Sequence, residues 1–183
     1  MPVSRKIIVL DRDGVINQDS DDYIKSPEEW IALPGSLEAI GKLCDAGYEV
    51  AVVTNQSGIA RGLFSQATLE RIHAKMVDCV AAAGGKLAGV YHCPHAPGDD
   101  CACRKPKPGL LHALQADLGL DTLSGVPFVG DKRSDIELAA AVGARSILVR
   151  TGKGEVTARD GADAEIFDDL AAVVDSLLSE PQA

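Results

Sequence analysis

The sequence predicts an α/β fold: a doubly wound parallel sheet with helices on both faces. Two observations support this prediction. Short apolar runs that are typical of buried strands alternate along the chain with amphipathic segments of helical period, and no internal repeat or low-complexity linker interrupts the alternation. Parallel strands that alternate with helices place the helices on both faces of one sheet. At 183 residues, we expect one domain that spans residues 1–183.

The expected strands are the short apolar runs that polar or turn residues bound. They cover residues 7–10, 48–53, 89–92, 126–129 and 146–149, with an edge strand at 164–167. The expected helices carry apolar residues on one face. They cover residues 36–46, 65–83, 108–118, 134–142 and a final segment from 170 to 178. Gly47 and Gly84 are stop signals, and Ser134 with Glu137 has the spacing of a capping box.

Charge and hydropathy limit the classes of partner. The formal charge of −9 argues against nucleic acid or an anionic membrane as the main partner. No apolar stretch approaches the ~20 residues that span a bilayer, and the apolar run near the start is too short for a signal peptide. We therefore expect a cytoplasmic protein that acts on a small molecule. The low aromatic content and the absence of a coiled-coil pattern favour a monomer.

The first candidate site residues follow the first expected strand. The segment Asp11-Arg12-Asp13-Gly14 comes directly after its apolar run. Open parallel sheets place ligands at the carboxyl ends of their strands, and two carboxylates this close repel each other unless a cation or a proton lies between them. Gly14 allows a sharp turn. Taken alone, the segment is equally typical of a solvated turn, so its meaning depends on the other strand ends.

Two further strand ends carry the residue types that phosphoryl transfer requires. Thr54 and Asn55 follow the second expected strand, and Asp131 follows the fourth, with Asp135 four residues further on. Carboxylates that meet at one sheet edge form a hard oxygen site suited to Mg²⁺, and Lys105 is a candidate for neutralising developing phosphoryl charge. Each element alone is also explained by capping of nearby backbone. Their combination favours a phosphoryl-transfer site.

A separate cluster of metal-ligand type lies between residues 93 and 103. Cys93 and His95 are followed, after five residues, by Cys101 and Cys103. Three thiols and one imidazole within eleven residues match a closed tetrahedral Cys₃His zinc site with a structural role. Free buried cysteines or a disulfide are the alternatives, and a reducing cytoplasm disfavours the disulfide. The remaining cysteines and histidines are expected to be structural: Cys44, Cys79, His73, His92 and His112.

The order of these motifs resembles that of phosphatases of the haloacid dehalogenase superfamily. The resemblance extends from about residue 6 to residue 152 and covers the acidic, threonine, lysine and closing acidic motifs. It implies an aspartyl-phosphate mechanism, in which Asp11 attacks phosphorus and Asp13 protonates the leaving alkoxide and then activates water. It also implies that Mg²⁺ is held by Asp11, the backbone carbonyl of Asp13, and Asp131. Thr54 and Lys105 complete the implied catalytic set.

The zinc loop and the Arg104-Lys105-Pro106 segment that follows it resemble two groups of this family. The heptose-1,7-bisphosphate 7-phosphatases are favoured by the segments 54–62, 106–109 and 130–132. This group implies removal of the 7-phosphate of D-glycero-D-manno-heptose 1,7-bisphosphate, in the synthesis of nucleotide-activated heptose for the lipopolysaccharide core. A histidinol-phosphate phosphatase of histidine biosynthesis is the first alternative. A non-catalytic zinc-containing binding protein is less favoured, because it has no need of the complete catalytic set.

The same resemblance implies a set of substrate contacts. Arg104 would bind the distal phosphate through its planar fork, although a salt bridge to the acidic surface is an alternative. Arg61 is equally interpretable as a substrate contact or as an exposed loop arginine. Only short insertions fit between the motifs, so we expect an open site without a large cap domain. The implied substrate-binding residues are Asp19, Asp22, Asn55, Gln56, Arg104 and Lys132.

Overall fold

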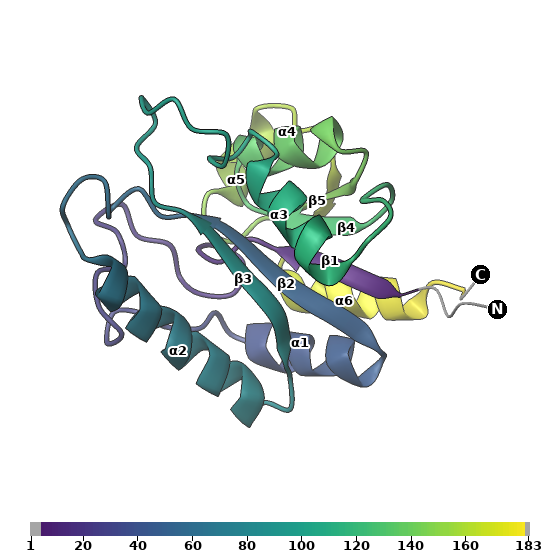
Figure 1. Ribbon diagram of the computed structural model, residues 1–183. Helices are drawn as coiled ribbons and strands as arrows, with labels where there is room; N and C mark the ends of the chain where they lie inside the picture. Colours follow the sequence, from purple (N-terminus) through teal and green to yellow (C-terminus); the bar gives the residue numbers. More distant parts are fainter. Residues whose placement is uncertain (1–4, 182–183) are drawn as a thin grey trace.

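A six-stranded parallel sheet forms the centre of the computed structural model, which describes residues 5–181 (Figure 1). The strand order is β3-β2-β1-β4-β5-β6, which confirms the predicted doubly wound sheet. The expected domain of residues 1–183 extends beyond the described range, because residues 1–4 and 182–183 lie outside it. The strands are β1 (Lys6–Leu10), β2 (Tyr48–Asn55), β3 (Leu87–Cys93), β4 (Pro127–Gly130), β5 (Arg145–Val149) and β6 (Glu165–Phe167).

The helices cover both faces of this sheet, with α1, α2 and α6 on one face and α3 and α4 on the other (Figure 1). Successive side chains of a strand point to opposite faces. Ile8 and Leu10 of β1 therefore join the core beneath α1, α2 and α6, whereas Val9 joins the core beneath α3 and α4. The helices are α1 (Ser36–Asp45), α2 (Gln66–Ala82), α3 (Gly109–Leu118), α4 (Arg133–Ala141), α5 (Gly154–Arg159) and α6 (Leu170–Ser179).

The predicted strands and helices are all present, and their ends differ from the expected ones by two residues or fewer. Local capping explains several of these ends. The hydroxyl of Ser65 accepts a hydrogen bond from the backbone N–H of Thr68 at the start of α2, and Asp169 caps α6 in the same way. Gly119 adopts a left-handed conformation that ends α3. Gly47 and Gly84, the predicted stop signals, also take positive φ values of 83° and 82° directly after the C-caps of α1 and α2.

The capping box predicted at Ser134 and Glu137 is wrong. The N-cap of α4 is Lys132, and the carboxylate of Asp135 accepts a hydrogen bond from the backbone N–H of Lys132 at 3.0 Å. The same oxygen accepts one from the N–H of Asp131 at 3.2 Å. The helix therefore begins where Asp135 can bind these two donors, slightly earlier than the expected start.

The short helix α5 is an element that the sequence pattern does not predict. It has six residues and no apolar stripe of helical period, so it lacks the signal on which helix prediction rests. A Cβ at Gly154 would overlap the backbone carbonyl of Val149, so glycine is required for the chain to turn this closely against β5. The helix matters for the site, because the hydroxyl of Thr157 donates a hydrogen bond of 2.8 Å to the backbone carbonyl of Asp131.

The chain reverses its direction of winding between β1 and β4, which lie side by side in the sheet. Ligands of open α/β sheets bind at such a switch point, outside the carboxyl ends of the strands. The connection 11–35, which follows β1, lies at this edge. It buries Val15, Ile16 and Trp30 in the core beneath α1, α2 and α6. The candidate site residues at the ends of β1, β2 and β4 therefore share one edge of the molecule.

Within residues 5–181, none of the helices is both long enough and apolar enough to cross a membrane.

Candidate active site

Strand register brings the candidate catalytic residues together. Leu10 of β1 lies level with Val52 of β2 and with Val129 of β4. Asp11, Thr54 and Asp131 follow within one or two residues of that level, and each is at least 96% buried. Residues that are separated by 120 positions in the chain therefore lie at one point, as the strand-end argument predicts.

Lys105 is the cation at the centre of this group. Its ammonium nitrogen lies 2.9 Å from Asp11 Oδ1 and 2.7 Å from Asp135 Oδ1, and it donates a hydrogen bond of 2.9 Å to the carbonyl of Val53. Burial opposes the charged form of Lys105, but the two carboxylates outweigh burial and raise the pKa of the ammonium group. Burial raises the pKa of Asp11, and Lys105 opposes that rise. The lysine is therefore charged and offsets the repulsion between two buried carboxylates.

Three buried carboxylates, those of Asp11, Asp131 and Asp135, place one oxygen each within 4.8 Å of one another. Oδ1 of Asp135 makes no hydrogen bond among residues 5–181, but it forms the ion pair of 2.7 Å with Lys105, and Oδ2 accepts hydrogen bonds from the N–H groups of Asp131 and Lys132. Asp131 differs from it. Its Oδ2 accepts a hydrogen bond from the N–H of Lys153 at 2.8 Å, but its buried Oδ1 has no hydrogen-bond partner among residues 5–181. An unpartnered buried carboxylate oxygen is costly.

These features fit a divalent cation beside Asp131 and Asp11. Burial raises the pKa of Asp131 to about 8, with smaller contributions from the carboxylates of Asp11 and Asp135, and Lys132 opposes the rise. Glycine is required around it: a Cβ at Gly14 or at Gly152 would overlap the Asp131 carboxylate. Two hard oxygen donors in a tight cradle match the preference of Mg²⁺. The expected ligands Asp11 and Asp131 are therefore adjacent, whereas the role of the Asp13 carbonyl stays a prediction.

Asp13 is held by several donors next to this group. Its Oδ1 accepts hydrogen bonds from the guanidinium of Arg12 at 2.8 and 3.1 Å and from Asn17 Nδ2 at 2.9 Å. Its Oδ2 accepts one from Gln56 Nε2 at 2.9 Å. Burial by itself would raise the pKa of Asp13, but Arg12, Asn17 and Gln56 together lower it below the usual range. The carboxylate is therefore ionised and fixed in orientation.

Two expected substrate contacts, Asn55 and Gln56, have other partners in the structure. The Asn55 amide accepts a hydrogen bond from the backbone N–H of Lys105 at 3.0 Å and donates one to the Lys105 carbonyl at 3.2 Å. Gln56 Nε2 donates to Asp13 and also to Thr54 Oγ1, both at 2.9 Å. Both residues line the pocket, but their side chains position Lys105 and Asp13. Their contact with substrate stays a prediction.

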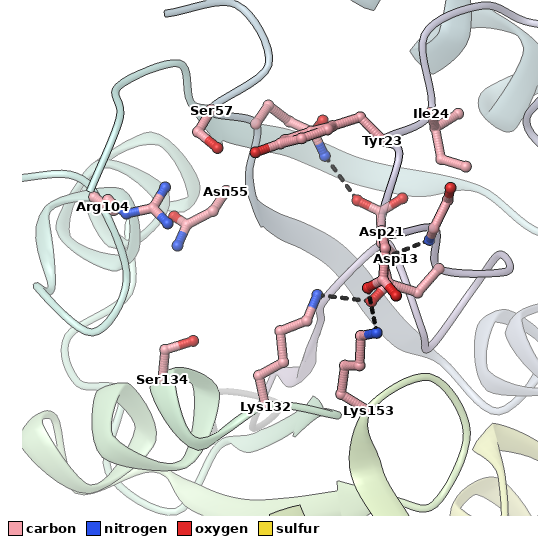
Figure 2. A pocket seen from close by; sticks show the side chains of 13 residues that line it. Asp13, Asp21, Tyr23, Ile24, Asn55, Ser57, Arg104, Lys132, Ser134 and Lys153 are labelled. Atoms are coloured by element: carbon pink, nitrogen blue, oxygen red, sulfur yellow. Dashed lines mark hydrogen bonds and ion pairs between the residues drawn. The ribbon is translucent and has the colours of Figure 1, made fainter. Parts of the chain in front are cut away.

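A pocket of about 310 Å³ opens beside these groups, and its walls carry both signs of charge. Lys132 Nζ pairs with Asp19 Oδ2 at 3.1 Å, and Lys153 pairs with Asp21. Figure 2 shows these lysines below the acidic side of the pocket, with Arg104 and Asn55 on the opposite side. This volume is at the lower end of small-ligand sites. The lining residues are Asp13, Asp19, Ser20, Asp21, Tyr23, Ile24, Asn55, Gln56, Ser57, Arg104, Lys132, Ser134 and Lys153.

Three expected substrate contacts, Asp19, Arg104 and Lys132, do line this pocket, whereas Asp22 is exposed and does not. Asp21 occupies the expected place instead. The reason is a turn at residues 20–23, in which the N–H of Tyr23 bonds to the Ser20 carbonyl and Tyr23 takes a positive φ of 67°. Arg61 lies outside the lining, with its guanidinium 5.9 Å from the centre of the Tyr23 ring.

Sequence reasoning places the segment from Asp19 to Asp22 against the sugar, which includes Asp21, but it missed Tyr23 and Lys153 as pocket residues. A signal for Lys153 was present, because it follows β5 at the same sheet edge as the other strand-end residues. No comparable signal identifies Tyr23, whose place depends on the fold of the connection 11–35.

The expected metal-ligand cluster is assembled in the loop after β3. Cys93 Sγ lies 3.8 Å from Cys101 Sγ and 3.2 Å from Cys103 Sγ, and His95 Nδ1 lies 3.5 Å from Cys93 Sγ and 3.3 Å from Cys103 Sγ. Sulfurs bound to zinc at about 2.3 Å in a tetrahedron are about 3.8 Å apart. The Cys93–Cys101 separation matches this value and the Cys93–Cys103 separation is shorter, and all four donors lie close enough together to bind one metal ion. All five cysteines are free thiols in the structure, so the disulfide alternative is not supported.

The metal-ligand loop leads directly into the active site. Arg104 and Lys105 follow Cys103 without a gap, and Arg104 Nη1 donates a hydrogen bond to the carbonyl of His95 at 3.2 Å. The N–H of Gly109 bonds to the carbonyl of Ala102 at 3.0 Å, and a Cβ at Gly109 would overlap that carbonyl. The cluster thus fixes both ends of the segment that presents Lys105 to the two aspartates.

Comparison with known proteins places this geometry among phosphatases. A family model described as HAD-hydrolase-like matches residues 102–177. The chain is 53% identical to a D-glycero-beta-D-manno-heptose-1,7-bisphosphate 7-phosphatase from Pseudomonas putida, over 94% of this chain and 99% of that protein. It is also 53% identical to the protein of the same description from Pseudomonas aeruginosa, over 96% and 99%.

Solved structures agree with these relatives. The crystal structure of D,D-heptose 1,7-bisphosphate phosphatase from Bordetella bronchiseptica, complexed with magnesium and phosphate, has a TM-score of 0.93 and 50% identity, covering 96% of this chain and 99% of that one. The phosphatase of the same description from Burkholderia thailandensis has a TM-score of 0.73 and 41% identity, with the same coverage. Magnesium and phosphate are thus bound by a protein with nearly the same backbone.

The buried position of Lys105 predicts the effect of its removal on stability. In Lys105→Met, Asp11 and Asp135 lose their counter-ion, so the free energy of unfolding should fall by about 3–5 kcal/mol. Urea unfolding at pH 7 without added Mg²⁺ measures this change. Uncompensated buried carboxylates have raised pKa values when folded, so protonation relieves them and the deficit should shrink as the pH is lowered.

The matched control for this prediction is Lys42→Met. Lys42 pairs with Asp175 at 3.0 Å, but both side chains are more than half exposed, so its loss should change the free energy of unfolding by less than about 1 kcal/mol. Similar small losses in both variants would contradict the role given to Lys105.

Proposed function

The chain belongs to the family of D-glycero-beta-D-manno-heptose-1,7-bisphosphate 7-phosphatases among the HAD-like hydrolases, and we propose that it removes the 7-phosphate of this bisphosphate sugar. One observation carries the proposal. Asp11, Asp13, Lys105 and Asp131 meet at the switch point of the sheet, beside a pocket with basic groups for a second phosphate. Identity above 50% over nearly the whole chain supports the same substrate.

Asp11 is the proposed nucleophile. Its Oδ1 is bound by Lys105 and by the N–H of Arg12 at 2.7 Å, so the carboxylate is held in one orientation. Attack of Asp11 on phosphorus would form the acyl phosphate while the bond from phosphorus to the sugar O7 breaks. Lys105 then lies close enough to stabilise negative charge that develops on the phosphoryl oxygens. Thr54, with its hydroxyl bound by Gln56, is the proposed further contact for the phosphoryl group.

Asp13 is the proposed general acid and base. In the first step it would give a proton to the departing O7, and in the second it would take a proton from the water that hydrolyses the acyl phosphate. The donors around it lower its pKa, so the resting carboxylate is in the form required for the second step. The first step requires that Asp13 binds a proton before the alkoxide leaves.

Mg²⁺ would be held by the carboxylates of Asp11 and Asp131 and, as the resemblance predicts, by the carbonyl of Asp13. A divalent cation at this point supplies Lewis-acid stabilisation of phosphoryl oxygens and orients them for in-line attack. The buried Oδ1 of Asp131, which has no hydrogen-bond partner within residues 5–181, supports this assignment.

The distal phosphate is proposed to bind to the basic groups that line the pocket, Arg104 and Lys132. Arg104 offers a planar fork there, and Lys132 offers an ammonium group whose pKa is raised by Asp131, Asp11 and Asp19 despite burial. Asp19 is the proposed acceptor for sugar hydroxyls. Asp21 lines the pocket and Asp22 does not, so Asp21 replaces Asp22 in this role.

The Cys₃His cluster is proposed to bind a structural Zn²⁺. Burial raises the pKa of the Cys93 thiol to about 12, so a cation is needed to keep that sulfur as a thiolate. All four donors come from the protein, which leaves no open position for catalysis. Thiolate ligands persist in a reducing compartment, and we place the enzyme in the cytoplasm. There it would supply heptose 1-phosphate for nucleotide-activated heptose and the lipopolysaccharide core.

Substrate preference tests this proposal. With Mg²⁺, the β anomer of the heptose bisphosphate should be cleaved at C7 with a kcat/KM at least a hundredfold above that for the α anomer, histidinol phosphate or fructose 1,6-bisphosphate. A hundredfold ratio corresponds to about 2.7 kcal/mol. Phosphate release measures the rates.

The kcat of Asp11→Asn should fall at least a thousandfold, because the nucleophile is gone. Full activity of Asp11→Asn would contradict the proposed mechanism. A preference of the wild-type enzyme for histidinol phosphate would contradict the proposed substrate.

A second prediction concerns Arg104. Arg104→Ala should lower kcat/KM for the heptose 1,7-bisphosphate about thirtyfold, because a charge-assisted contact worth roughly 2 kcal/mol is removed. The matched substrate is heptose 7-phosphate, which lacks the distal phosphate and should show a loss of threefold or less in the same variant. Equal losses on both substrates would mean that Arg104 acts on the reacting phosphate or on the fold.

The third prediction concerns the metal-ligand loop. Cys101→Ser should lose bound zinc, measured by elemental analysis, and should unfold at a lower temperature. A half-buried cysteine outside the cluster supplies the control: Cys79→Ser should keep its zinc. Retention of one zinc per chain in Cys101→Ser would show that the proposed ligand set is incorrect.

A further inference from the structure

Arg12 is a buried cation that the proposed mechanism does not use. The residue is fully buried, and its Nε and Nη2 both donate to the same oxygen of Asp13, Oδ1. A guanidinium normally binds a carboxylate through both of its oxygens. Here Oδ2 of Asp13 is left to Gln56, a neutral donor, at 2.9 Å. The two carboxylate oxygens of Asp13 are therefore in different environments.

His73 of α2 explains how the guanidinium keeps this arrangement. Its Nε2 lies 3.2 Å from Arg12 Nη1. Arginine has donors only, so Nε2 must accept this hydrogen bond and the imidazole is neutral. Burial and the charge of Arg12 lower the pKa of His73 to about 3, in agreement with that assignment. The remaining nitrogen of the guanidinium, Nη1, is thus bound by a neutral acceptor, so Asp13 and His73 hold the guanidinium from two sides.

The His73 ring is itself fixed in place. The neighbouring residue Ile72 is fully buried in the core beneath α1, α2 and α6, and so is Met76, one turn further on. These two side chains anchor this face of α2. The ring packs edge-on against His92 of β3, with 5.8 Å between the ring centres. His92 Nε2 in turn lies 3.2 Å from Gln66 Oε1. The acceptor for Arg12 is therefore presented by a helix and a strand that are both part of the rigid scaffold.

We propose that His73 is a positioning residue for the proton transfers at Asp13. By binding Arg12 Nη1, it holds the guanidinium on Oδ1 and leaves Oδ2 as the oxygen that exchanges the proton. The proton on Oδ2 passes to O7 of the sugar as the P–O7 bond breaks and the bond from Asp11 to phosphorus forms. Oδ2 then takes a proton from water as water attacks phosphorus, which releases phosphate and restores Asp11. This inference rests on the proposed phosphatase activity.

Leaving-group dependence tests the inference. A poor leaving group such as the sugar alkoxide needs the acid, whereas 4-nitrophenolate does not, and kcat/KM reports only the steps up to its departure. In His73→Leu, kcat/KM should fall about tenfold or more on the heptose bisphosphate and less than about twofold on 4-nitrophenyl phosphate. Activity on the aryl ester also shows that the variant is folded. His73→Gln places an amide oxygen near the position of Nε2 and should restore most of the lost activity on the sugar.

The control is His112→Leu, which removes an exposed histidine on α3 and should leave both substrates unaffected. Equal losses of His73→Leu on the two esters, no loss on either, or failure of His73→Gln to recover activity would overturn the inference. The wild-type enzyme is measured first. If it cleaves aryl and simple alkyl phosphates but not the heptose bisphosphate, the proposed substrate fails while the comparison of leaving groups still decides the role of His73. If it cleaves no phosphate ester, both proposals fail.

Discussion

The ion pairs of Lys105 with Asp11 and Asp135 are the interaction on which the rest of the site depends. Parallel strands bring carboxylates to one edge of the sheet, and at that edge they are buried, so their repulsion is weakly screened. One buried ammonium group offsets two of them at 2.9 and 2.7 Å. Because Asp135 also binds the first N–H groups of α4, and Asn55 binds the backbone of Lys105, the same cation links the ends of β1 and β2 to the start of α4. Removal of Lys105 would leave two buried carboxylates without their counter-ion.

Lys105 reaches this position from a loop that has little apolar surface of its own. The Cys₃His cluster provides the missing constraint, because four donors separated by 3.2–3.8 Å tie the two ends of the loop together immediately before Arg104 and Lys105. Asp131, the third carboxylate, keeps one buried oxygen, Oδ1, without a hydrogen-bond partner in the described range 5–181. The buried carboxylates therefore have two kinds of counter-ion. The ammonium group of Lys105 balances Asp11 and Asp135, and Asp131 lies at a position suited to a divalent cation.

The pocket extends from the catalytic edge onto the irregular connections of the chain. Asp11, Thr54 and Asp131 follow strands and are buried, so their geometry follows from the sheet. Asp13, Asn55 and Arg104 line the pocket beside them, and the rest of the lining includes the connection 11–35 and the loops after β4 and β5, where Asp19 and Asp21 pair with Lys132 and Lys153. These pairs are exposed in part and weaker, so a phosphorylated ligand can replace them. Arg12 and His73 join the two parts, since they hold Asp13, which belongs to both.

The sequence by itself determined the sheet, its helices and the chemical types of the two metal-ligand groups. Each of these depends on a local pattern: apolar runs of strand length, stripes of helical period, and close spacing of cysteine, histidine and aspartate. Only the tertiary structure decided that Asp21 rather than Asp22 lines the pocket, that Asn55 binds the backbone of Lys105, and that α5 packs on Asp131. It also decided that His73 faces Arg12 across 61 residues of chain. The physical reason is that these contacts join residues that are distant in sequence or lie on irregular connections. Such connections have no periodicity, so the sequence pattern does not indicate which way their side chains face.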